Sequence, residues 1–215
     1  MKKPKQKSRC RWCDGPLPRP RRYAGDLDFC KKSCRQAAWR VRCRYRIDQE
    51  NKRPRRCAIA DPPYPGLAWR YKDQPSYKGE VDHVKLIASL RAHYDGWALC
   101  TGAYALRDLL PLCPAEARVC AWVKPHGVSS KTFGIHNAWE PVIVVPARHL
   151  RPGKRDWLLT PPARGGGDVW GRKPEAFCCW LFELLGMLPG DQLDDLFPGS
   201  GIVGRAWAEI CRGTA

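Results

Sequence analysis

The sequence lacks any run of 18 consecutive apolar residues, so we expect neither a membrane-spanning helix nor a membrane partner. Its lysine-rich N-terminus is not followed by the apolar stretch of a secretory signal, and we therefore predict a cytoplasmic protein. No internal repeat is visible. The 215 residues are 44% hydrophobic and 27% charged, which is typical of a globular chain with one full core and a small appendage.

Acidic residues are scarce in the first quarter of the chain. Residues 1–56 hold 20 Lys and Arg against 5 Asp and Glu, a net charge of +15, whereas residues 57–215 hold 18 against 16, a net charge of +2. Such a basic block is typical of contact with a phosphate backbone, because each neutralised phosphate releases a counterion. A merely solubilising basic tail is the alternative interpretation.

Histidines at metal-ligand spacing are also lacking. No two of the five histidines form a ligand pair, and we interpret them as surface or loop residues. They are His83, His93, His126, His136 and His149.

Cysteine, by contrast, is abundant, with 12 residues. In an intracellular chain this number favours metal binding or ordinary packing over disulfides. Only four cysteines have ligand spacing, a CxxC pair followed after 16 residues by a CxxxC pair, and this pattern predicts a closed, structural Zn²⁺ site. Four ordinary thiols are the alternative. The predicted ligands are Cys10, Cys13, Cys30 and Cys34.

Six further cysteines lie in apolar stretches, where a free thiol behaves as a small hydrophobe, so we predict that they pack in the core. They are Cys57, Cys100, Cys120, Cys178, Cys179 and Cys211.

A basic helix is predicted to follow the second cysteine pair, from Ser33 to about Arg46, and the module resembles small treble-clef-like fingers. Arginines on this helix are expected to contact phosphates or a groove of nucleic acid, namely Arg35, Arg40, Arg42 and Arg44. We predict four segments: a disordered basic tail (1–9), a zinc-finger nucleic-acid-binding module (10–47), a linker (48–56) and a main domain (57–215).

The main domain alternates strand and helix patterns, which predicts an α/β fold with a mostly parallel sheet covered on both faces. Strands are expected near 57–60, 97–101, 117–124, 141–146, 157–160 and 193–197, and helices near 80–93, 103–112, 174–186 and 202–211. The segments 125–137 and 146–172 are interpreted as long loops that flank the substrate cleft.

A carboxylate, two prolines and an aromatic follow the first of these strands. Asp61 and the Pro62 carbonyl can both accept hydrogen bonds from an exocyclic amine, and Tyr64 offers a flat face for a base. Such a pocket suits a base that has left the stack, such as an adenine whose N6 amine accepts a methyl group. An ordinary turn at the end of a strand is the alternative. The predicted catalytic residues are Asp61, Pro62, Pro63 and Tyr64.

A second motif, DLFPGSG, leads from the last strand into the last helix. Its glycines permit a tight turn and close approach of a nucleotide-like cofactor, to which the helix would present its N-terminus. The predicted cofactor-binding residues are Asp195, Phe197, Gly199, Ser200 and Gly201, together with Asp61.

These motifs, in this order, resemble the β-class amino-methyltransferases and the related mRNA adenosine methyltransferase family. The resemblance covers residues 57–212 and includes Trp122-Val123-Lys124, Glu140-Pro141-Val142-Ile143 and Arg172-Lys173-Pro174. With its cysteine module, the whole chain looks like compact phage or prophage DNA adenine methyltransferases. The resemblance implies a Rossmann-like, S-adenosylmethionine-dependent methyltransferase sheet with permuted motif order, in which Lys173 contacts the cofactor.

The function so implied is methyl transfer from S-adenosylmethionine to the N6 amine of adenine in DNA. RNA adenosine and cytosine N4 stay open as alternative acceptors, and a catalytically inactive, nucleic-acid-binding adaptor is the alternative from another class. The chain departs from nucleotide-binding folds in one respect, because no acidic residue follows Gly201 on a second strand to hold the cofactor ribose. His136 and Asn137 are candidates for that role.

Overall fold

The computed structural model describes residues 52–74, 77–129, 136–150, 153–163 and 173–213. Contacts divide the chain into two units, Met1–Arg53 and Pro54–Ala215, and the description that follows concerns the second. The predicted tail, the zinc-finger module and most of the linker lie outside the described residues, as do the four proposed zinc ligands and the basic helix.

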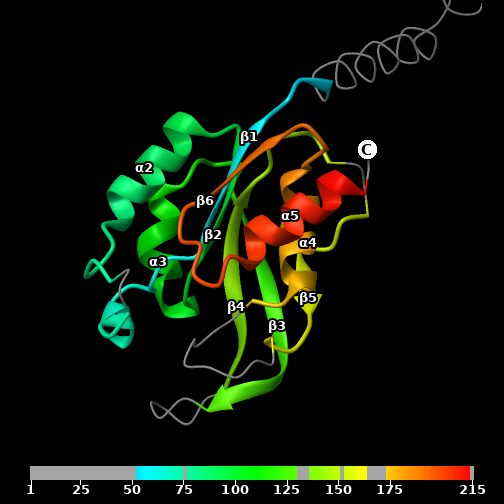
Figure 1. The fold of residues 1–215 in the computed structure, drawn as a ribbon. Coiled ribbons are helices and arrows are strands. Elements are labelled where there is room, and N and C mark those ends of the chain that lie inside the picture. Colours follow the sequence, from blue (N-terminus) through cyan, green and yellow to red (C-terminus); the bar gives the residue numbers. More distant parts are fainter. Residues whose placement is uncertain (1–51, 75–76, 130–135, 151–152, 164–172, 214–215) are drawn as a thin grey trace, which may run out of the picture. The chain divides into compact units, whose positions relative to one another are not determined.

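A six-stranded sheet with the order β5-β3-β4-β2-β1-β6 forms the centre of this unit (Figure 1). Its strands are β1 (Arg56–Ala60), β2 (Gly96–Cys100), β3 (Arg118–Ser129), β4 (His136–Val145), β5 (Trp157–Leu159) and β6 (Gln192–Asp195). β1 pairs in parallel with both β2 and β6, and β3 with β5, whereas β4 runs antiparallel to both of its neighbours. The predicted mostly parallel sheet is confirmed, with β4 as the reversed strand.

Helices cover both faces of the sheet. On one face lie α4 (Glu175–Leu185) and α5 (Ile202–Arg212), which pack on a core that includes Cys57, Ile59 and Trp122. On the other lie α2 (His83–His93) and a helical segment made of η2 (Ala103–Ala105), α3 (Leu106–Leu109) and η3 (Leu110–Leu112), over a core that includes Ala58, Trp97 and Ile143. A further short helix, η1 (Ala68–Tyr71), lies between β1 and α2 in the chain.

Local sequence explains where these elements begin and end. β1 alternates its side chains between the two cores, because successive residues of a strand point to opposite faces of the sheet. Asp82 caps α2 by accepting a hydrogen bond from the Lys85 N–H at 3.0 Å. Gly186 ends α4 in the left-handed conformation with φ of 69°, which glycine adopts without steric cost.

Of the six cysteines predicted to pack, Cys57, Cys100, Cys120 and Cys178 are buried, and Cys179 and Cys211 are half-buried. Burial raises the pKa of Cys57 to about 12, so its thiol is protonated at neutral pH. The predicted core packing is confirmed for five of these residues, whereas Cys179 belongs to neither of the two core clusters.

Two predictions need correction. The segment 125–137 is not simply a loop, since β3 extends to Ser129 and β4 starts at His136, with a register shift between Val123 and Val128. His83 is not a surface residue: it is buried at the start of α2, where its Nδ1 lies 2.8 Å from the Val81 carbonyl. His93 and His149 are exposed as predicted, and the side chains of His126 and His136 are not described. No helix among the described residues is long and apolar enough to cross a membrane.

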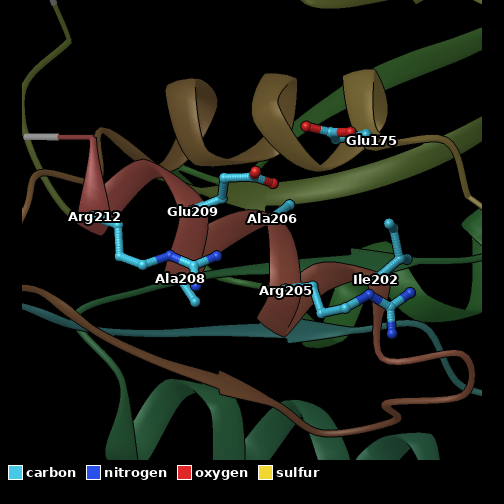
Figure 2. A pocket seen from close by; sticks show the side chains of 7 residues that line it. All are labelled: Glu175, Ile202, Arg205, Ala206, Ala208, Glu209 and Arg212. Carbon is cyan, nitrogen blue, oxygen red and sulfur yellow. The ribbon is translucent and has the colours of Figure 1, made fainter.

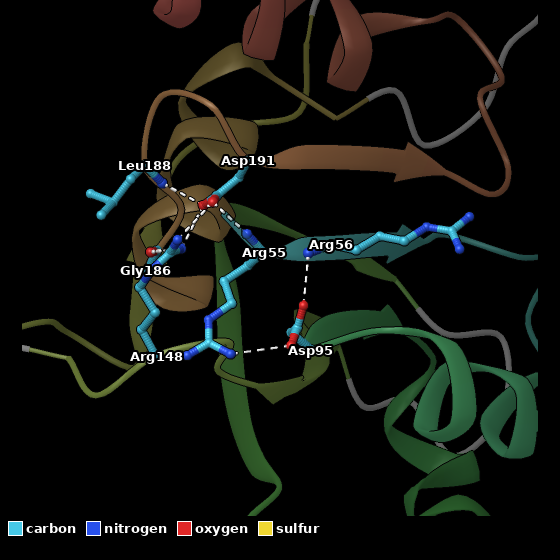
Figure 3. Close-up of polar contacts among 7 residues, drawn as sticks. All are labelled: Arg55, Arg56, Asp95, Arg148, Gly186, Leu188 and Asp191. Carbon is cyan, nitrogen blue, oxygen red and sulfur yellow. Dashed lines mark hydrogen bonds and ion pairs between the residues drawn. The ribbon is translucent and has the colours of Figure 1, made fainter. Parts of the chain in front are cut away.

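A buried ion pair joins the segments at the amino ends of β1 and β6 (Figure 3). Both side chains are almost fully buried, with Arg148 Nη1 at 2.5 Å from Asp191 Oδ2 and Nη2 at 2.7 Å from Oδ1. Asp191 also accepts hydrogen bonds from the backbone N–H groups of Arg55 and Leu188, and Arg148 donates to the Gly186 carbonyl. We call Arg148, Asp191 and these backbone partners the basal cluster. It connects β1 to the chain that leaves β4 and to the turn between α4 and β6.

Candidate functional site

Two carboxylates meet at the other edge of the sheet. Asp61 directly follows β1, and Asp195 ends the neighbouring parallel strand β6, where it pairs in register with Ile59. The carboxyl ends of parallel strands share one edge of the sheet, which is where ligands bind in open α/β folds. The two motifs that the sequence separates by about 130 residues are therefore adjacent.

Lys173 holds Asp61. Its Nζ lies 2.9 Å from each carboxylate oxygen of Asp61 and 3.6 Å from Glu140 Oε2. Burial by itself would lower the pKa of this lysine, since only 8% of its side chain is exposed, but the surrounding negative groups, Asp61 first, raise it well above its ordinary value. Lys173 is consequently a permanent cation at this edge. Three rings surround its ammonium at 5.5–5.8 Å, those of Tyr64, Trp122 and Phe177.

Glu140 is the hub that connects the remaining groups. It lies on β4 opposite Trp122 of β3, accepts a hydrogen bond from the Tyr64 hydroxyl at 2.9 Å and forms a short ion pair with Lys124. Burial acts to raise the pKa of Glu140, but Lys173 and Lys124 outweigh it, so the pKa lies below its ordinary value. We call Asp61, Tyr64, Lys124, Glu140 and Lys173 the apical cluster.

Glu140 and Lys124 were not among the site residues predicted from the sequence. Both belong to segments that carry the family resemblance, Trp122-Val123-Lys124 and Glu140-Pro141-Val142-Ile143, and this was the available signal. Their connection to Tyr64 depends on the antiparallel pairing of β3 with β4, which the sequence did not reveal.

The segment from Asp61 to Tyr64 is firmly fixed. Pro62 is buried, and the Tyr64 ring packs against the core beneath α4 while its hydroxyl is held by Glu140. Burial raises the pKa of Tyr64 well above its ordinary value, so the phenol stays protonated and donates this hydrogen bond. The ring orientation is thus set by packing at one end and by a hydrogen bond at the other.

The glycine-rich turn has the predicted form. Gly199 and Gly201 adopt φ values of 46° and 70°, a conformation that side chains disfavour, and Gly201 stands at the N-terminus of α5. The turn is closed by a hydrogen bond of 2.6 Å from the Gly201 N–H to the Pro198 carbonyl, and Arg205 donates to the Ser200 carbonyl at 2.8 Å. The backbone beside β6 is therefore shaped for close approach of a ligand, with Phe197 packed on the α2 side.

Unpartnered polar atoms accompany these residues. Asp195 Oδ2 and Thr101 Oγ1 are buried and have no hydrogen-bond partner among the described residues. Burial raises the pKa of Asp195, and the nearby charge of Asp61 adds to this, against the Phe197 N–H that lowers it. A buried acceptor without a donor is costly, so a hydrogen-bond donor from a ligand at this edge would stabilise it.

The site does not resemble a metal centre. No group of three or more His, Cys, Asp or Glu residues in the described part of the chain is arranged to hold an ion. A hollow of about 450 Å³ lies elsewhere on the described surface, along α5 beside the start of α4 (Figure 2). Two arginines and two glutamates contribute to its lining, which consists of Glu175, Ile202, Arg205, Ala206, Ala208, Glu209 and Arg212. None of the predicted catalytic or cofactor-binding residues is among them.

Comparison with known proteins identifies the fold. No protein-family model matches the chain, and no curated protein matches it. Among solved structures, the crystal structure of the M1.HpyAVI–SAM complex aligns with a TM-score of 0.51 at 15% identity, covering 80% of this chain and 85% of that one. A second crystal structure, of M1.HpyAVI, gives a TM-score of 0.43 at 14% identity, covering 78% of this chain and 81% of that one. The chain thus shares its α/β fold with the protein of the M1.HpyAVI–SAM complex, which agrees with the predicted fold class.

Proposed function

We propose that this protein transfers a methyl group from S-adenosylmethionine to the exocyclic N6 amine of adenine in DNA. The observation that carries the proposal is the meeting of Asp61-Pro62 with Lys173 and with the glycine turn at one edge of the sheet. The fold shared with the M1.HpyAVI–SAM complex supports the cofactor, and the carboxylate and aromatic of the acceptor motif support an amine on a flat base.

The residues at this edge fit the cofactor. The acidic, unpartnered Asp195 Oδ2 suits a ligand that brings positive charge and hydrogen-bond donors, and Lys173 suits its carboxylate. We assign cofactor binding to Lys173 and Asp195, together with the turn residues Phe197, Gly199, Ser200 and Gly201, with Asp61 close by. When bound, S-adenosylmethionine supplies an activated methyl group on its sulfonium, and the protein supplies position and electrostatics.

The catalytic motif binds and activates the acceptor amine. Its lone pair is delocalised into the ring, and hydrogen bonds to Asp61 and to the Pro62 carbonyl favour a pyramidal, more nucleophilic nitrogen. Asp61 can keep its ion pair with Lys173 while it does so, since each carboxylate oxygen accepts more than one hydrogen bond. Tyr64 provides the flat contact for the base, with its ring held by Glu140. The proton that the methylated amine releases passes to water.

Residues 10–47 are assigned to the binding of nucleic acid. We assign structural Zn²⁺ to Cys10, Cys13, Cys30 and Cys34, and phosphate contacts to the following arginines, on the basis of spacing and charge alone. A module of this size buries too little core to fold by itself, so removing the metal with a chelator is expected to unfold it and weaken DNA binding. Metal analysis and DNA titration before and after chelation test this, and unchanged affinity after confirmed metal loss would contradict it.

Two other acceptors and one other class remain as alternatives. RNA adenosine differs from the proposal in the polymer only, and cytosine N4 offers the same kind of amine. An inactive adaptor would use the fold to bind nucleic acid without transfer, but the presence of Asp61, Lys173 and both turn glycines favours an enzyme.

The test is a tritium transfer assay with labelled cofactor on DNA and RNA oligonucleotides, followed by nucleoside analysis. We expect N6-methyladenine in DNA, and loss of incorporation in Asp61→Ala. Asp108→Ala, which removes an exposed carboxylate on α3, is the matched control and should transfer normally. Methylcytosine or methylated RNA would redirect the proposal to an alternative acceptor, and full activity in Asp61→Ala would refute the mechanism.

A further inference from the structure

A short helix with exposed aromatics directly follows the catalytic motif. In η1, Trp69 is 60% exposed, the largest exposure among the exposed aromatic residues described, and the Arg70 guanidinium lies over its ring at 5.6 Å. Tyr104, from η2, is 54% exposed. Arg70 and the exposed Lys72 bring positive charge to the same place. We call Trp69, Arg70, Lys72 and Tyr104 the rim surface.

The rim surface is attached to the catalytic motif by specific hydrogen bonds. The Tyr104 hydroxyl donates to the Pro65 carbonyl at 2.7 Å, one residue after Tyr64. The Glu80 carboxylate accepts from the backbone N–H groups of Gly66 at 3.3 Å and Ala68 at 3.2 Å, and so holds the chain that connects motif and helix. The position of Trp69 relative to Asp61 is therefore set by the fold.

The same helix also reaches toward the reacting centre. Tyr71 is half-buried, and its pKa is raised by burial first and by the charge of Asp61 second, while Lys173 opposes the rise. η1 thus has one half-buried aromatic residue, Tyr71, and one exposed to solvent, Trp69. A polymer whose reacting base lies at Asp61 would bring its neighbouring nucleotides over the rim surface.

Exposed rings combined with cations have the chemistry of a single-strand contact. Bases stack on aromatic side chains without regard to sequence, and arginine and lysine contact the phosphates between them. We propose that the rim surface binds the nucleotides flanking the target base, with stacking on Trp69 and Tyr104 and phosphate contacts from Arg70 and Lys72. This inference rests on the proposed function and adds the surface that holds the strand there.

The chain contains a matched control for this feature. Trp157 on β5 is 45% exposed and has the Arg155 guanidinium over its ring at 5.3 Å, so it repeats the Trp69–Arg70 pair in chemistry and exposure. β5 is the outermost strand, separated from β1 by β3, β4 and β2. Trp157→Ala removes the same ring from a place that a strand bound at Asp61 has no reason to contact.

The experiment uses the full-length protein and an oligonucleotide with 2-aminopurine beside the target adenine. We expect this base to be quenched by stacking when wild-type protein or Trp157→Ala binds, and to regain fluorescence with Trp69→Ala. Binding of Trp69→Ala, measured by anisotropy at raised salt to screen the basic N-terminal block, should weaken about 5-fold or more, the effect of losing one stacked base. Arg70→Gln should reduce the slope of log affinity against log salt by about one.

The outcomes separate the two proposals. Unchanged quenching and affinity in Trp69→Ala would overturn the rim surface even if methyl transfer is found. The opposite result is also possible: the wild-type protein quenches the probe, Trp69→Ala abolishes the quenching, and no methyl group is transferred. That result would support the rim surface and refute the proposed enzyme. Light scattering tests a second occupant of the surface. If Trp69→Ala alters self-association but leaves the quenching unchanged, a second copy of the chain covers this surface, and the rim-surface proposal is overturned.

Discussion

The two buried ion networks of this domain lie at opposite edges of one sheet and differ in how completely their groups are satisfied. In the basal cluster, Arg148 and Asp191 are 4% and 1% exposed, and Asp191 accepts from two backbone N–H groups as well as from both Nη atoms of the arginine. In the apical cluster, Asp61 and Glu140 are partly exposed, and the neighbouring Asp195 and Thr101 each have a buried oxygen without a partner in the described chain.

This difference separates stability from reactivity. A saturated buried pair resists change, because removing one partner leaves the other charge without compensation. An incompletely satisfied cluster costs stability but leaves acceptors for a ligand, as sites built for function often do. The basal cluster therefore connects the strands, and the apical cluster is where we propose that the reaction takes place. Substitutions in the two clusters should consequently separate cleanly between folding and activity.

The largest expected effect is that of Asp61→Ala on transfer. Removing the acceptor for the amine should lower the rate by about 10³-fold, within the usual range for a positioned catalytic carboxylate. The protein should stay folded, because Lys173 retains Glu140 as a partner. Single-turnover methylation combined with circular dichroism measures both effects. If the variant unfolds instead, Asp61 is needed for stability, and the two clusters do not differ in the way described.

Asp191→Ala should show the opposite behaviour. Loss of the carboxylate leaves the buried Arg148 guanidinium uncompensated and should lower the free energy of unfolding by about 3–5 kcal/mol. Transfer per folded molecule, assayed at low temperature, should be unchanged. Chemical denaturation gives the stability, and replacing both partners together, Arg148→Met with Asp191→Leu, is the control that should recover much of it. A specific loss of turnover in the folded protein would contradict a purely structural basal cluster.

Glu140→Gln should have an intermediate effect on activity. Glutamine can still accept from Tyr64, but the lost charge removes one of the two carboxylates that face Lys173, so Lys173 binds Asp61 more tightly and the Asp61 carboxylate becomes a poorer acceptor. We expect transfer to fall about 10-fold in kcat, as after loss of ~1.4 kcal/mol, with little change in KM for the cofactor. An equal change in KM would instead assign Glu140 to cofactor binding.

The same variant has a predictable pH dependence. Because the folded-state pKa of Glu140 lies below its ordinary value of 4.5, its charge contributes stability above that pH and loses the contribution as pH falls through the lower, folded-state pKa. The stability difference between wild type and Glu140→Gln should therefore shrink in acid. Urea unfolding across the acid range measures it, and a constant difference would show that the charge of Glu140 does not contribute.

Asp195→Asn should give the smallest effect, with opposite signs for stability and binding. The raised pKa of Asp195 means that its ionisation costs the folded state stability as pH rises past its ordinary value, so the neutral asparagine should raise Tm at neutral pH by about 2 °C. Cofactor affinity, measured by calorimetry, should fall. A lower Tm would show that Asp195 is already satisfied, and Asp194→Asn, on the same strand, is the control for a general charge effect.

Most of the fold followed from local patterns. The apolar runs of β1, β2 and β4 and the helical spacing in α2, α4 and α5 predicted these elements to within a few residues. The extension of β3 and β4 was missed because PHGVS and HNAWE have no strand alternation, and their pairing depends on each other. The burial of His83 was missed for a similar reason, since it results from packing around α2 and not from its neighbours in the chain.

The candidate site was predicted in part. Asp61, Tyr64, Lys173 and the glycines of the turn stand in recognisable motifs, and the structure places Asp61 against Lys173. Glu140, which connects Tyr64 to both lysines, has no signal of its own beyond a short similarity. The rim surface had no signal in the sequence, since WRYK after a proline-rich turn has neither periodicity nor a motif. What the sequence missed are contacts between segments that are distant along the chain.

By itself, the sequence determined the alternation of strands and helices, the chemical types at the two motifs and the concentration of positive charge in the first 56 residues. These properties are local, because backbone preference, side-chain chemistry and formal charge belong to each residue or its near neighbours. Only the tertiary structure decided that β4 runs against its neighbours, that one end of the strands has a saturated ion pair and that the other has an acid, Asp195, with a buried oxygen that has no partner among the described residues. Burial and pairing depend on which distant segments meet, and they set both the charge state of a carboxylate and its freedom to bind a substrate.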